Sequence, residues 1–324
     1  MGAAAVARPL VVVLCGPTGV GKSQWALRLA EQWPLSIISV DSAQVFRGLD
    51  IGTAKPDKAT RERVPHYLVD IRDPAAAYSA GEFVRDARAA ITDSLAAGRL
   101  PVLVGGTMMY FRALLHGIAA LPQASAPLRA ELAAWAERDG WEALHRELAR
   151  VDPLAAARIH SRDPQRIQRA LEVYRLSGRP ITAWQQQTKV VADDFRWLRL
   201  ALVVADRVAH RRQLRLRWEA MLGTGLLEEV RALHHRPDLN EHLPAIRSVG
   251  YRQLWAHIAG KATLEEASDL ALKATGQLAK RQMTWIKADP GLACINWEDP
   301  NLSKKLNRSL QEAYAAVRAD GPAC

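Results

Sequence analysis

Cysteine is scarce in this sequence of 324 residues, and the few cysteines follow no recognisable pattern. The three of them, Cys15, Cys294 and Cys324, lie far apart and form no CxxC pair. A disulfide framework and a cysteine-rich zinc module both need regularly spaced cysteines, so the sequence excludes both. Such sparse use of cysteine is typical of a reducing compartment, and we therefore expect a cytoplasmic protein.

The sequence also lacks long apolar runs and internal repeats. A membrane-spanning helix needs about 20 consecutive apolar residues, and no run comes near that length. The run Leu10–Cys15 behind Arg8 is too short for a signal peptide, and no small-residue cleavage site follows it. We expect no membrane association, and we expect a monomer without an obligate protein partner.

Negative charge is the scarcer sign. Asp and Glu total 34 against 44 Lys and Arg, which leaves a formal charge of +10. This excess favours polyanions, so nucleic acid, phosphorylated substrates and membrane surfaces are candidate partners, and charge alone does not choose among them. Hydrophobic residues make up 49% of the chain, enough for a buried core in about two domains.

The first third of the sequence alternates short apolar runs with helical patterns. Four runs have the length and composition of β-strands: Leu10–Cys15, Leu35–Val40, Tyr67–Ile71 and Leu100–Val104. Between them we expect a helix after Gly21 and another from Ser79, where Ser79 and Glu82 match a capping box. This alternation predicts a parallel sheet with helices on both faces.

The pattern becomes wholly helical after about His116. One helix is bounded by Asp163 as N-cap, Pro164 at the first position and Gly178 beyond the end. A strand returns at Trp197–Val204, and the last long helix runs from the capping box at Thr263 toward Lys287. We predict an α/β fold: a P-loop NTPase-like parallel sheet core at 1–116 and 197–324, interrupted by an all-helical insertion domain at 117–196.

A phosphate-binding loop follows the first strand. The pattern GxxxxGK[ST] is matched in full by Gly16, Pro17, Thr18, Gly19, Val20, Gly21, Lys22 and Ser23. Such a loop surrounds phosphate oxygens with backbone N–H groups, and the following helix N-terminus adds partial positive charge. Lys22 would neutralise a terminal phosphate and Ser23 would hold Mg²⁺. The loop predicts a diphosphate-like ligand without saying whether phosphate is transferred, hydrolysed or expelled.

Two further strands end in polar groups that face the same crevice. Asp41 follows the second strand, and Gly105, Gly106 and Thr107 end the fourth. Ligands of open α/β sheets bind at the carboxyl ends of the strands. Asp41 is therefore a Mg²⁺ ligand or a general base, unless it only caps a loop, and Thr107 is a site hydroxyl or an N-cap. Nearby Arg47 and Lys55 are either site cations or solvated loop charges.

Together these segments resemble the tRNA dimethylallyltransferase family in its bacterial form. The resemblance rests on GPTGVGKS at 16–23, DSAQVFRGLDIGTAKP at 41–56, VGGTMMY at 104–110, DPQRIQRALEVY at 163–174, IRSVGYRQLW at 246–255 and QLAKRQMTWIK at 277–287. These motifs are collinear and cover nearly the whole chain. The zinc-finger tail of eukaryotic members is missing.

The resemblance implies a specific transfer. A dimethylallyl group would pass from dimethylallyl diphosphate to N6 of the adenine 3′ of the anticodon, in tRNAs reading codons that begin with U. Asp41 would be the general base, and Thr107 would lie near the bridging oxygen or the adenine. Arg217, which with Met221 matches the family's arginine-x-x-x-methionine pattern, would stabilise the departing diphosphate together with Lys22 and Mg²⁺.

The resemblance also implies a tRNA surface for the anticodon stem-loop, gripped in part by the insertion domain. The implied contacts are Asp41, Ser42, Ala43, Gln44, Thr107, Arg129, Gln165, Arg166, Ile167, Gln168, Arg169, Arg247, Ser248, Val249, Gly250, Tyr251, Arg252, Lys280, Arg281, Gln282, Met283, Thr284, Trp285, Ile286 and Lys287. Tyr251 and Trp285 could stack on bases beside phosphate-binding cations. The alternative for each helix is a solvated charged face with Trp285 in the core.

Two other functions fit parts of the sequence. A small-molecule P-loop kinase would use Asp41 for Mg²⁺ or the acceptor hydroxyl and the insertion as a lid, but about 80 residues is large for a lid. An RNA-remodelling ATPase would show coupling motifs and repeated cores, and neither is visible.

Overall fold

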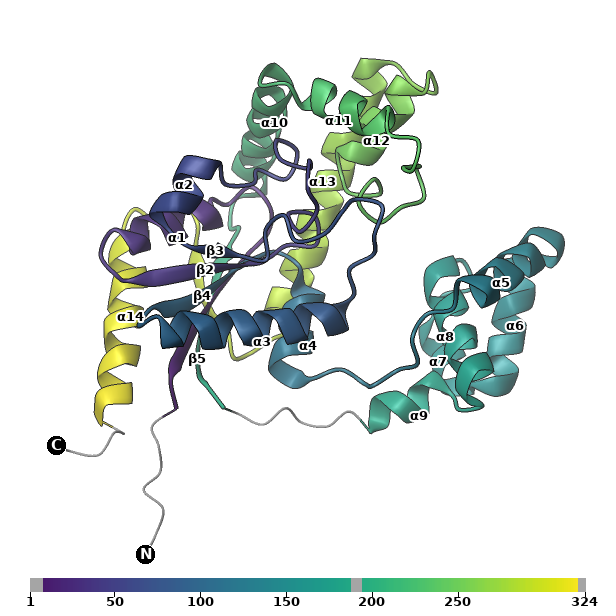
Figure 1. Ribbon diagram of the computed structural model, residues 1–324, viewed down its shortest axis with the longest axis horizontal. Helices are drawn as coiled ribbons and strands as arrows, with labels where there is room; N and C mark the ends of the chain where they lie inside the picture. The colour runs from purple at the N-terminus through teal and green to yellow at the C-terminus, as the bar shows by residue number, and fades with distance from the viewer. Residues whose placement is uncertain (1–7, 188–193, 320–324) are drawn as a thin grey trace, which may run out of the picture. The chain divides into compact units, whose positions relative to one another are not determined.

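Six parallel strands form one sheet in the computed structural model, which describes residues 8–187 and 194–319 (Figure 1). The strand order is β3-β2-β4-β1-β5-β6, so consecutive strands of the chain are not always neighbours. The strands are β1 (Leu10–Cys15), β2 (Leu35–Val40), β3 (His66–Tyr67), β4 (Leu100–Gly105), β5 (Arg196–Val203) and β6 (Ala293–Asn296). The predicted α/β class with a parallel sheet is therefore confirmed.

The chain divides into two compact units, Met1–Arg112 with Asp193–Cys324, and Ala113–Ala192. The first unit holds the sheet. Its helices are α1 (Lys22–Ala30), α2 (Lys58–Arg63), α3 (Ala80–Ala96), α10 (Arg207–Gly223), α11 (Leu226–His234), α12 (Tyr251–Ile258), α13 (Leu264–Lys287) and α14 (Leu302–Ala319). Helix α4 (Met108–His116) crosses the boundary between the units.

Two parts of the sheet differ from the sequence prediction. The strand expected at Tyr67–Ile71 is wrong beyond its first residue, because Leu68 and Asp70 have φ angles of 62° and 59°. A left-handed backbone cannot continue a β-ladder. Strand β6 was not expected: it is short, half-exposed and paired only with β5, so it lacks the apolar signature of a central strand.

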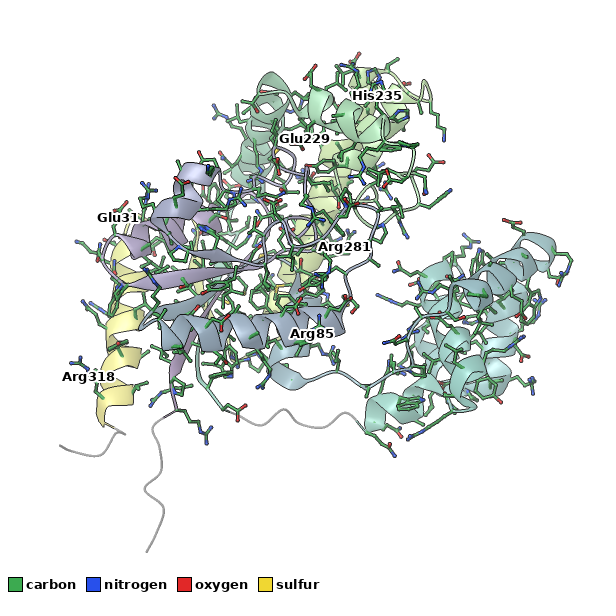
Figure 2. All side chains as sticks on the ribbon, in the orientation of Figure 1. Glu31, Arg85, Glu229, His235, Arg281 and Arg318 are labelled. Atoms are coloured by element: carbon green, nitrogen blue, oxygen red, sulfur yellow. The ribbon has the colours of Figure 1, made fainter. Side chains whose placement is uncertain are left out.

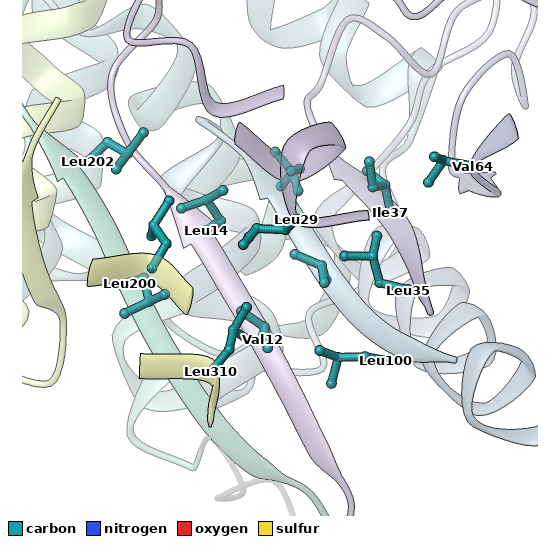
Figure 3. Packing of buried hydrophobic residues seen from close by; sticks show 14 of the residues in the cluster. Val12, Leu14, Leu29, Leu35, Ile37, Val64, Leu100, Leu200, Leu202 and Leu310 are labelled. Carbon is teal, nitrogen blue, oxygen red and sulfur yellow. The ribbon is translucent and has the colours of Figure 1, made fainter. Parts of the chain in front are cut away.

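The sheet core lies on both faces of β1, β2 and β4, whose residues are all buried. Alternate side chains such as Val12 and Leu14 pack with Leu29 of α1 and Leu310 of α14, as Figure 3 shows. Neighbouring residues point to the opposite face, which α3 covers. Burial on both faces explains why these strands read as unbroken apolar runs.

The predicted helix signals are confirmed. Ser79 and Thr263 each form the capping box, and Asp163 accepts a hydrogen bond from the Arg166 amide at 3.2 Å. Gly178 ends its helix with φ 67°, a conformation that glycine adopts without steric cost. Within residues 8–187 and 194–319, no helix combines the length and apolar character needed to cross a membrane.

The second unit consists of helices over its described residues. They are α5 (Ala126–Asp139), α6 (Trp141–Val151), α7 (Pro153–Arg158), α8 (Pro164–Ser177) and α9 (Ile181–Gln186). Its core is formed by aliphatic side chains from all five helices, among them Leu132, Leu144, Ile167 and Ile181.

A fully buried carboxylate lies at the edge of this core. Glu172 accepts hydrogen bonds from Arg129 at 2.9 and 3.2 Å, from Arg169 at 2.6 Å and from the Ser125 amide at 2.9 Å. Burial alone would raise the pKa of Glu172, but the two guanidinium groups and the amide outweigh it and lower the pKa. Glu172 therefore joins α8 to the start of α5.

We expect Glu172→Gln to lower the free energy of unfolding by about 2–4 kcal/mol, because two arginines lose their charged partner. Urea titration measures this. Because the folded-state pKa is depressed, the difference from wild type should shrink as pH falls below the ordinary value of 4.5. Glu131→Gln, at an exposed pair with Arg175, is the matched control and should change stability little. Equal effects of the two variants would contradict a structural role for Glu172.

Candidate active site

The phosphate loop connects β1 to α1 in close contact with its surroundings. Gly19 and Gly21 have φ angles of 84° and 77°, which favour glycine at both positions. A Cβ at Gly16 would lie 2.7 Å from the Leu202 carbonyl oxygen, and one at Gly19 would lie 2.5 Å from Leu214 Cδ2. The spacing of the motif's glycines thus follows from both the backbone conformation and the packing against β5 and α10.

Lys22 lies at the first turn of α1 and points back over the loop. Its Nζ donates to the Pro17 carbonyl oxygen at 2.7 Å. Burial lowers the pKa of Lys22 from 10.5 to about 8; Asp41 opposes this shift and Arg217 adds to it. An anion that displaces the carbonyl contact would restore the full charge on Lys22. The next residue, Ser23, is exposed, so its hydroxyl is accessible to a ligand.

Asp41 is held by the backbone that follows it. One carboxylate oxygen, Oδ1, accepts from the amides of Ala43 at 2.8 Å and Gln44 at 3.3 Å. No hydrogen bond to Oδ2 occurs among the residues that the structure describes. The carboxylate is thus oriented by one oxygen while the other remains available for a reacting group.

Arg217 reaches the same space from α10. Its side chain is partly buried, and burial lowers its pKa, an effect that Asp41 opposes. Because Asp41 affects the pKa of both Lys22 and Arg217, and Arg217 affects the pKa of Lys22, the structure brings the three charges together. Two cations and one carboxylate around a phosphate loop can bind an anionic group and exchange a proton beside it.

Thr107 lies beside Asp41 because β4 and β2 end at the same level. A Cβ at Gly105 would lie only 2.0 Å from the Val40 carbonyl oxygen, so only glycine permits this approach. Thr107 Oγ1 accepts from the Ser42 amide at 3.1 Å, and the Thr107 amide donates to the Val40 carbonyl at 3.1 Å. The predicted pair of loops is therefore joined directly.

Tyr110 closes this part of the site. Its ring stacks on Phe83 with centroids 4.4 Å apart, and its hydroxyl donates to the Tyr78 carbonyl at 3.3 Å. Burial raises the pKa of Tyr110 to about 12, and the nearby Asp41 contributes. Tyr110 is therefore an uncharged side chain that lies near Asp41.

A glutamate missed by sequence reasoning holds the segment DIGT. Glu229 of α11, labelled in Figure 2, lies far from this segment in sequence. It accepts from the amides of Asp50 at 3.0 Å, Ile51 at 2.7 Å and Gly52 at 3.3 Å, and from the Tyr251 hydroxyl. A Cβ at Gly52 would lie 2.6 Å from the Tyr251 ring. Nothing in the local sequence indicates these partners, because they lie almost 180 residues from the loop.

Lys55 and Arg47 were each predicted to be a site cation or a solvated loop charge, and the structure places them differently. Lys55 is buried and donates to the Phe46 carbonyl at 2.7 Å and to Asp50 and Asp70 at 2.5 and 2.6 Å. It is therefore a structural cation. Arg47 is exposed and donates to the Asp70 carbonyl at 3.3 Å.

The amide of Gln44 also has internal partners. It accepts from Ser39 Oγ at 2.8 Å and donates to the Thr53 carbonyl at 3.1 Å, which ties the start of the 41–56 segment to its end. Ala43 is partly buried beside it. Of the tRNA contacts implied at 41–44, only Ser42 is well exposed.

Five residues of the predicted tRNA surface are buried, and this corrects the prediction of direct contact. Ile167, Tyr251 and Ile286 belong to the cores, Gly250 packs near Trp218, and the Gln282 amide is used inside the protein. Tyr251 is fully buried and cannot stack on a base, and the pKa of its hydroxyl is raised by burial and by Glu229. Ile167 and Gln282 each follow an exposed arginine and face inward, because successive residues of a helix lie on different faces.

Most of the remaining predicted contacts reach solvent. On α13, Lys280, Arg281 and Lys287 are exposed, and Figure 2 labels Arg281 there. Trp285 is 40% exposed with the Arg112 guanidinium 5.6 Å from its ring, so the alternative that buries it is wrong. The other exposed members are Gln165, Arg166, Arg247, Arg252 and Thr284, and the partly buried ones are Gln168, Ser248, Val249 and Met283.

Arg129 and Arg169 have a second role that the sequence did not indicate. Both neutralise the buried Glu172 of the helical unit. Their side chains remain 47% and 29% exposed.

In the described stretches 8–187 and 194–319, no cluster of three or more His, Cys, Asp or Glu could hold a metal ion alone. A donor set of a hydroxyl and a carboxylate suits Mg²⁺ only when phosphates complete it.

Comparison with known proteins gives one consistent result. The model of the family described as IPP transferase matches residues 44–289. A tRNA dimethylallyltransferase of Thioalkalivibrio sulfidiphilus is 50% identical over 97% of this chain and 98% of its own length. That of Bordetella petrii is 53% identical over 94% and 98% of the two chains.

Solved structures agree with these relatives. The tRNA isopentenylpyrophosphate transferase of Bacillus halodurans matches with a TM-score of 0.69 and 32% identity, over 97% of this chain and 98% of that one. A eukaryotic dimethylallyltransferase acting on tRNA matches with a TM-score of 0.78 and 25% identity, over 95% of this chain and 80% of that one.

The depressed pKa of Lys22 leads to a prediction about anion binding. Lys22 is protonated below its pKa of about 8, so affinity for inorganic diphosphate should fall as pH rises. Between pH 7 and 9.5 we expect a loss of about tenfold, measured by calorimetry, because one charged hydrogen bond is lost. Lys22→Arg is the control, because arginine stays protonated over this range while the diphosphate titrates in the same way with both proteins. Identical pH profiles for the two proteins would contradict the assignment.

Proposed function

Because this chain belongs to the IPP transferase family, we propose that it transfers a dimethylallyl group from dimethylallyl diphosphate to tRNA. The acceptor is N6 of the adenine 3′ of the anticodon in tRNAs that read codons beginning with U. The observation that carries this proposal is the meeting of Lys22, Asp41 and Arg217 beside a phosphate loop. One site thus holds an anionic leaving group and a base.

The diphosphate is the leaving group in this proposal. The amides of the loop and of the α1 N-terminus bind its oxygens, and Lys22 and Arg217 stabilise the charge that develops as it departs. Thr107 contributes a hydroxyl at the end of β4, adjacent to Asp41 through Ser42. Phosphate is therefore expelled as diphosphate and is not transferred to the acceptor.

Asp41 is the proposed general base. The N6 nitrogen forms a bond to the allylic carbon while the carbon–oxygen bond breaks and its electron pair leaves with diphosphate. Adenine N6 is a poor nucleophile because its lone pair is delocalised into the ring, so removal of its proton by Asp41 assists the step. The two amide contacts to Oδ1 hold the carboxylate while Oδ2 takes the proton.

Mg²⁺ fits this site as a cofactor. The exposed Ser23 hydroxyl at the start of α1 offers an oxygen ligand of the kind that Mg²⁺ uses beside substrate phosphates. When bound, the ion would neutralise negative charge on the diphosphate.

The exposed cations form the proposed tRNA surface. Lys280, Arg281 and Lys287 on α13 and Arg247 and Arg252 before and in α12 bind phosphates of the anticodon stem-loop, and Trp285 offers a stacking face. The target base must leave its stack for N6 to reach the donor. We assign gripping of the stem-loop in part to the helical unit, through Gln165, Arg166 and the exposed edges of Arg129 and Arg169. The sparse cysteines are in keeping with work in the cytoplasm.

The deciding experiment mixes purified protein, Mg²⁺, radiolabelled dimethylallyl diphosphate and unmodified tRNA. Label should enter tRNA, and inorganic diphosphate should be released in equal amount. A parallel reaction with labelled ATP tests the kinase alternative: phosphate transfer or release from ATP, without prenylation of tRNA, would overturn the proposal.

Asp41→Asn keeps the size of the side chain and removes its basicity. We expect kcat to fall by about 10²–10⁴, the usual contribution of a positioned base, with little change in tRNA affinity. Single-turnover transfer of label and stem-loop titration measure the two quantities. Asp50→Asn is the control, since Asp50 lies in the same segment but on the structural Lys55 network. A variant at Asp41 that retains most of its turnover would exclude the general-base role.

Loss of an exposed cation should change the salt dependence of tRNA binding. For Lys280→Ala and Arg281→Ala we expect weaker binding and a slope of log K against log salt that is smaller by about 0.7–0.9 per variant. Fluorescent stem-loop titrations at several salt concentrations give this slope. Lys304→Ala on α14 is the matched control, and donor binding should stay normal in all three. Unchanged slopes would mean that these cations belong to a solvated helix face and bind no phosphate.

A further inference from the structure

One buried amide joins the two loops that meet the diphosphate. Gln282 of α13 accepts from the Thr18 amide at 2.9 Å and donates to the Gly106 carbonyl at 2.8 Å. Thr18 belongs to the phosphate loop, and Gly106 immediately precedes Thr107. The side chain of Gln282 is thus a cross-link between the loops after β1 and β4.

Thr18 is also held from its other side. His210 Nε2 lies 2.8 Å from the Thr18 carbonyl oxygen, which requires Nε2 to carry the hydrogen. The peptide groups on both sides of Thr18 are therefore fixed, one by α13 and one by α10, the helix that carries Arg217. Because the Thr18 N–H is already bonded to Gln282, the loop binds phosphate with its later amides.

The fit around Gln282 is specific for an amide. A Cβ at Gly106 would lie 2.3 Å from Gln282 Nε2, so glycine at 106 is what allows the amide to reach the carbonyl. One partner needs an acceptor and the other needs a donor. A glutamate would satisfy Thr18 but would place a second acceptor against the Gly106 oxygen, and an apolar side chain would satisfy neither.

Near Gln282, one face of helix α13 is exposed to solvent and the other is buried. Lys280 and Arg281 are exposed, whereas the next residue, Gln282, is 7% exposed and points to the loops. Successive residues of one helix thus form part of the proposed tRNA surface and the contact with the phosphate loop and the Thr107 loop.

We propose that Gln282 is a positioning residue that sets the spacing between the phosphate loop and Thr107, and so aligns the departing diphosphate. This inference rests on the proposed function. Gln282 touches neither substrate; it acts through Thr18 and through Gly106–Thr107. Loss of the bridge lets the two loops separate, and a misplacement of about 1 Å in an active site can cost about 10²-fold in rate.

The first test compares Gln282→Met, which has a similar length and no amide, with Gln277→Met, an exposed glutamine of the same helix. For Gln282→Met we expect kcat to fall by about 10–100-fold, with the Kd for the stem-loop within about twofold of wild type. Gln277→Met should resemble wild type. If Gln282→Met lowers only the melting temperature and leaves kcat unchanged, the inference is wrong. Gln282→Glu, which keeps one of the two bonds, provides a second variant if the first does not fold.

A double-mutant cycle with Thr107→Val separates positioning from general structural support. If Gln282 acts through Thr107, the double variant should be little slower than the slower single variant, because both changes remove the same function. Independent losses that multiply would overturn the inference.

Binding of inorganic diphosphate in the presence of Mg²⁺ keeps this inference distinct from the proposed function. Gln282→Met should weaken that binding by about tenfold, because the phosphate loop loses a fixed hydrogen bond. This measurement needs no tRNA and no prenyl donor, so it applies even if wild-type protein transfers no label. Unchanged diphosphate affinity would refute the bridge whatever the enzyme's acceptor is.

Discussion

The parallel register of the central strands is the constraint on which the site depends. Cys15 of β1 lies opposite Gly105 of β4, and Gly105 lies opposite Val40 of β2. The three strands therefore end at one level, and the next residues along the chain begin the phosphate loop, the Asp41 turn and the Thr107 loop. A shift of one residue in any strand would exchange the side chains on its two faces and move its loop away from the other two. Hydrophobic burial on both sheet faces thus fixes the geometry of the polar groups at the sheet's edge.

The loops beyond that edge have little regular structure, and side chains from within the loops and from distant helices supply their hydrogen-bond partners. Glu229 holds three successive amides of residues 50–52, Lys55 neutralises two carboxylates, and Gln282 bridges two loops. Backbone groups removed from water need such partners, so each bridge also fixes a loop conformation. Consequently, several of the most distinctive sequence motifs turn out to mark the supports of the site as well as its reacting groups. DIGTAKP is a clear case, since its glycine packs against a tyrosine ring and its lysine is buried.

The proposed tRNA surface shows how a helix serves two purposes with neighbouring residues. On α13, Lys280 and Arg281 face solvent while Gln282 and Ile286 face the protein. In the helical unit, Arg129 and Arg169 neutralise a buried glutamate while their side chains remain partly exposed. Substitution of these two arginines would therefore affect folding as well as the proposed RNA binding, whereas substitution of Lys280 or Arg281 would test the proposed binding alone.

The sequence by itself determined the elements that depend on local signals. Glycine spacing, capping boxes and apolar runs predicted the phosphate loop, the long helices and four of the strands, because these features depend on residues close together in the chain. Asp41 and Thr107 could be assigned to the site because parallel strands end at a common edge. Only the tertiary structure decided which neighbouring polar residues reach a ligand and which support a loop. Glu229 and Gln282 bond loops that lie nearly 180 residues or more away in sequence, and Tyr251 packs against the equally distant Gly52; such contacts arise from the packing of whole helices, which no local pattern encodes. The left-handed turn at Leu68 and Asp70 likewise follows from the buried Lys55 network that holds Asp70, and not from the apolar residues that suggested a strand.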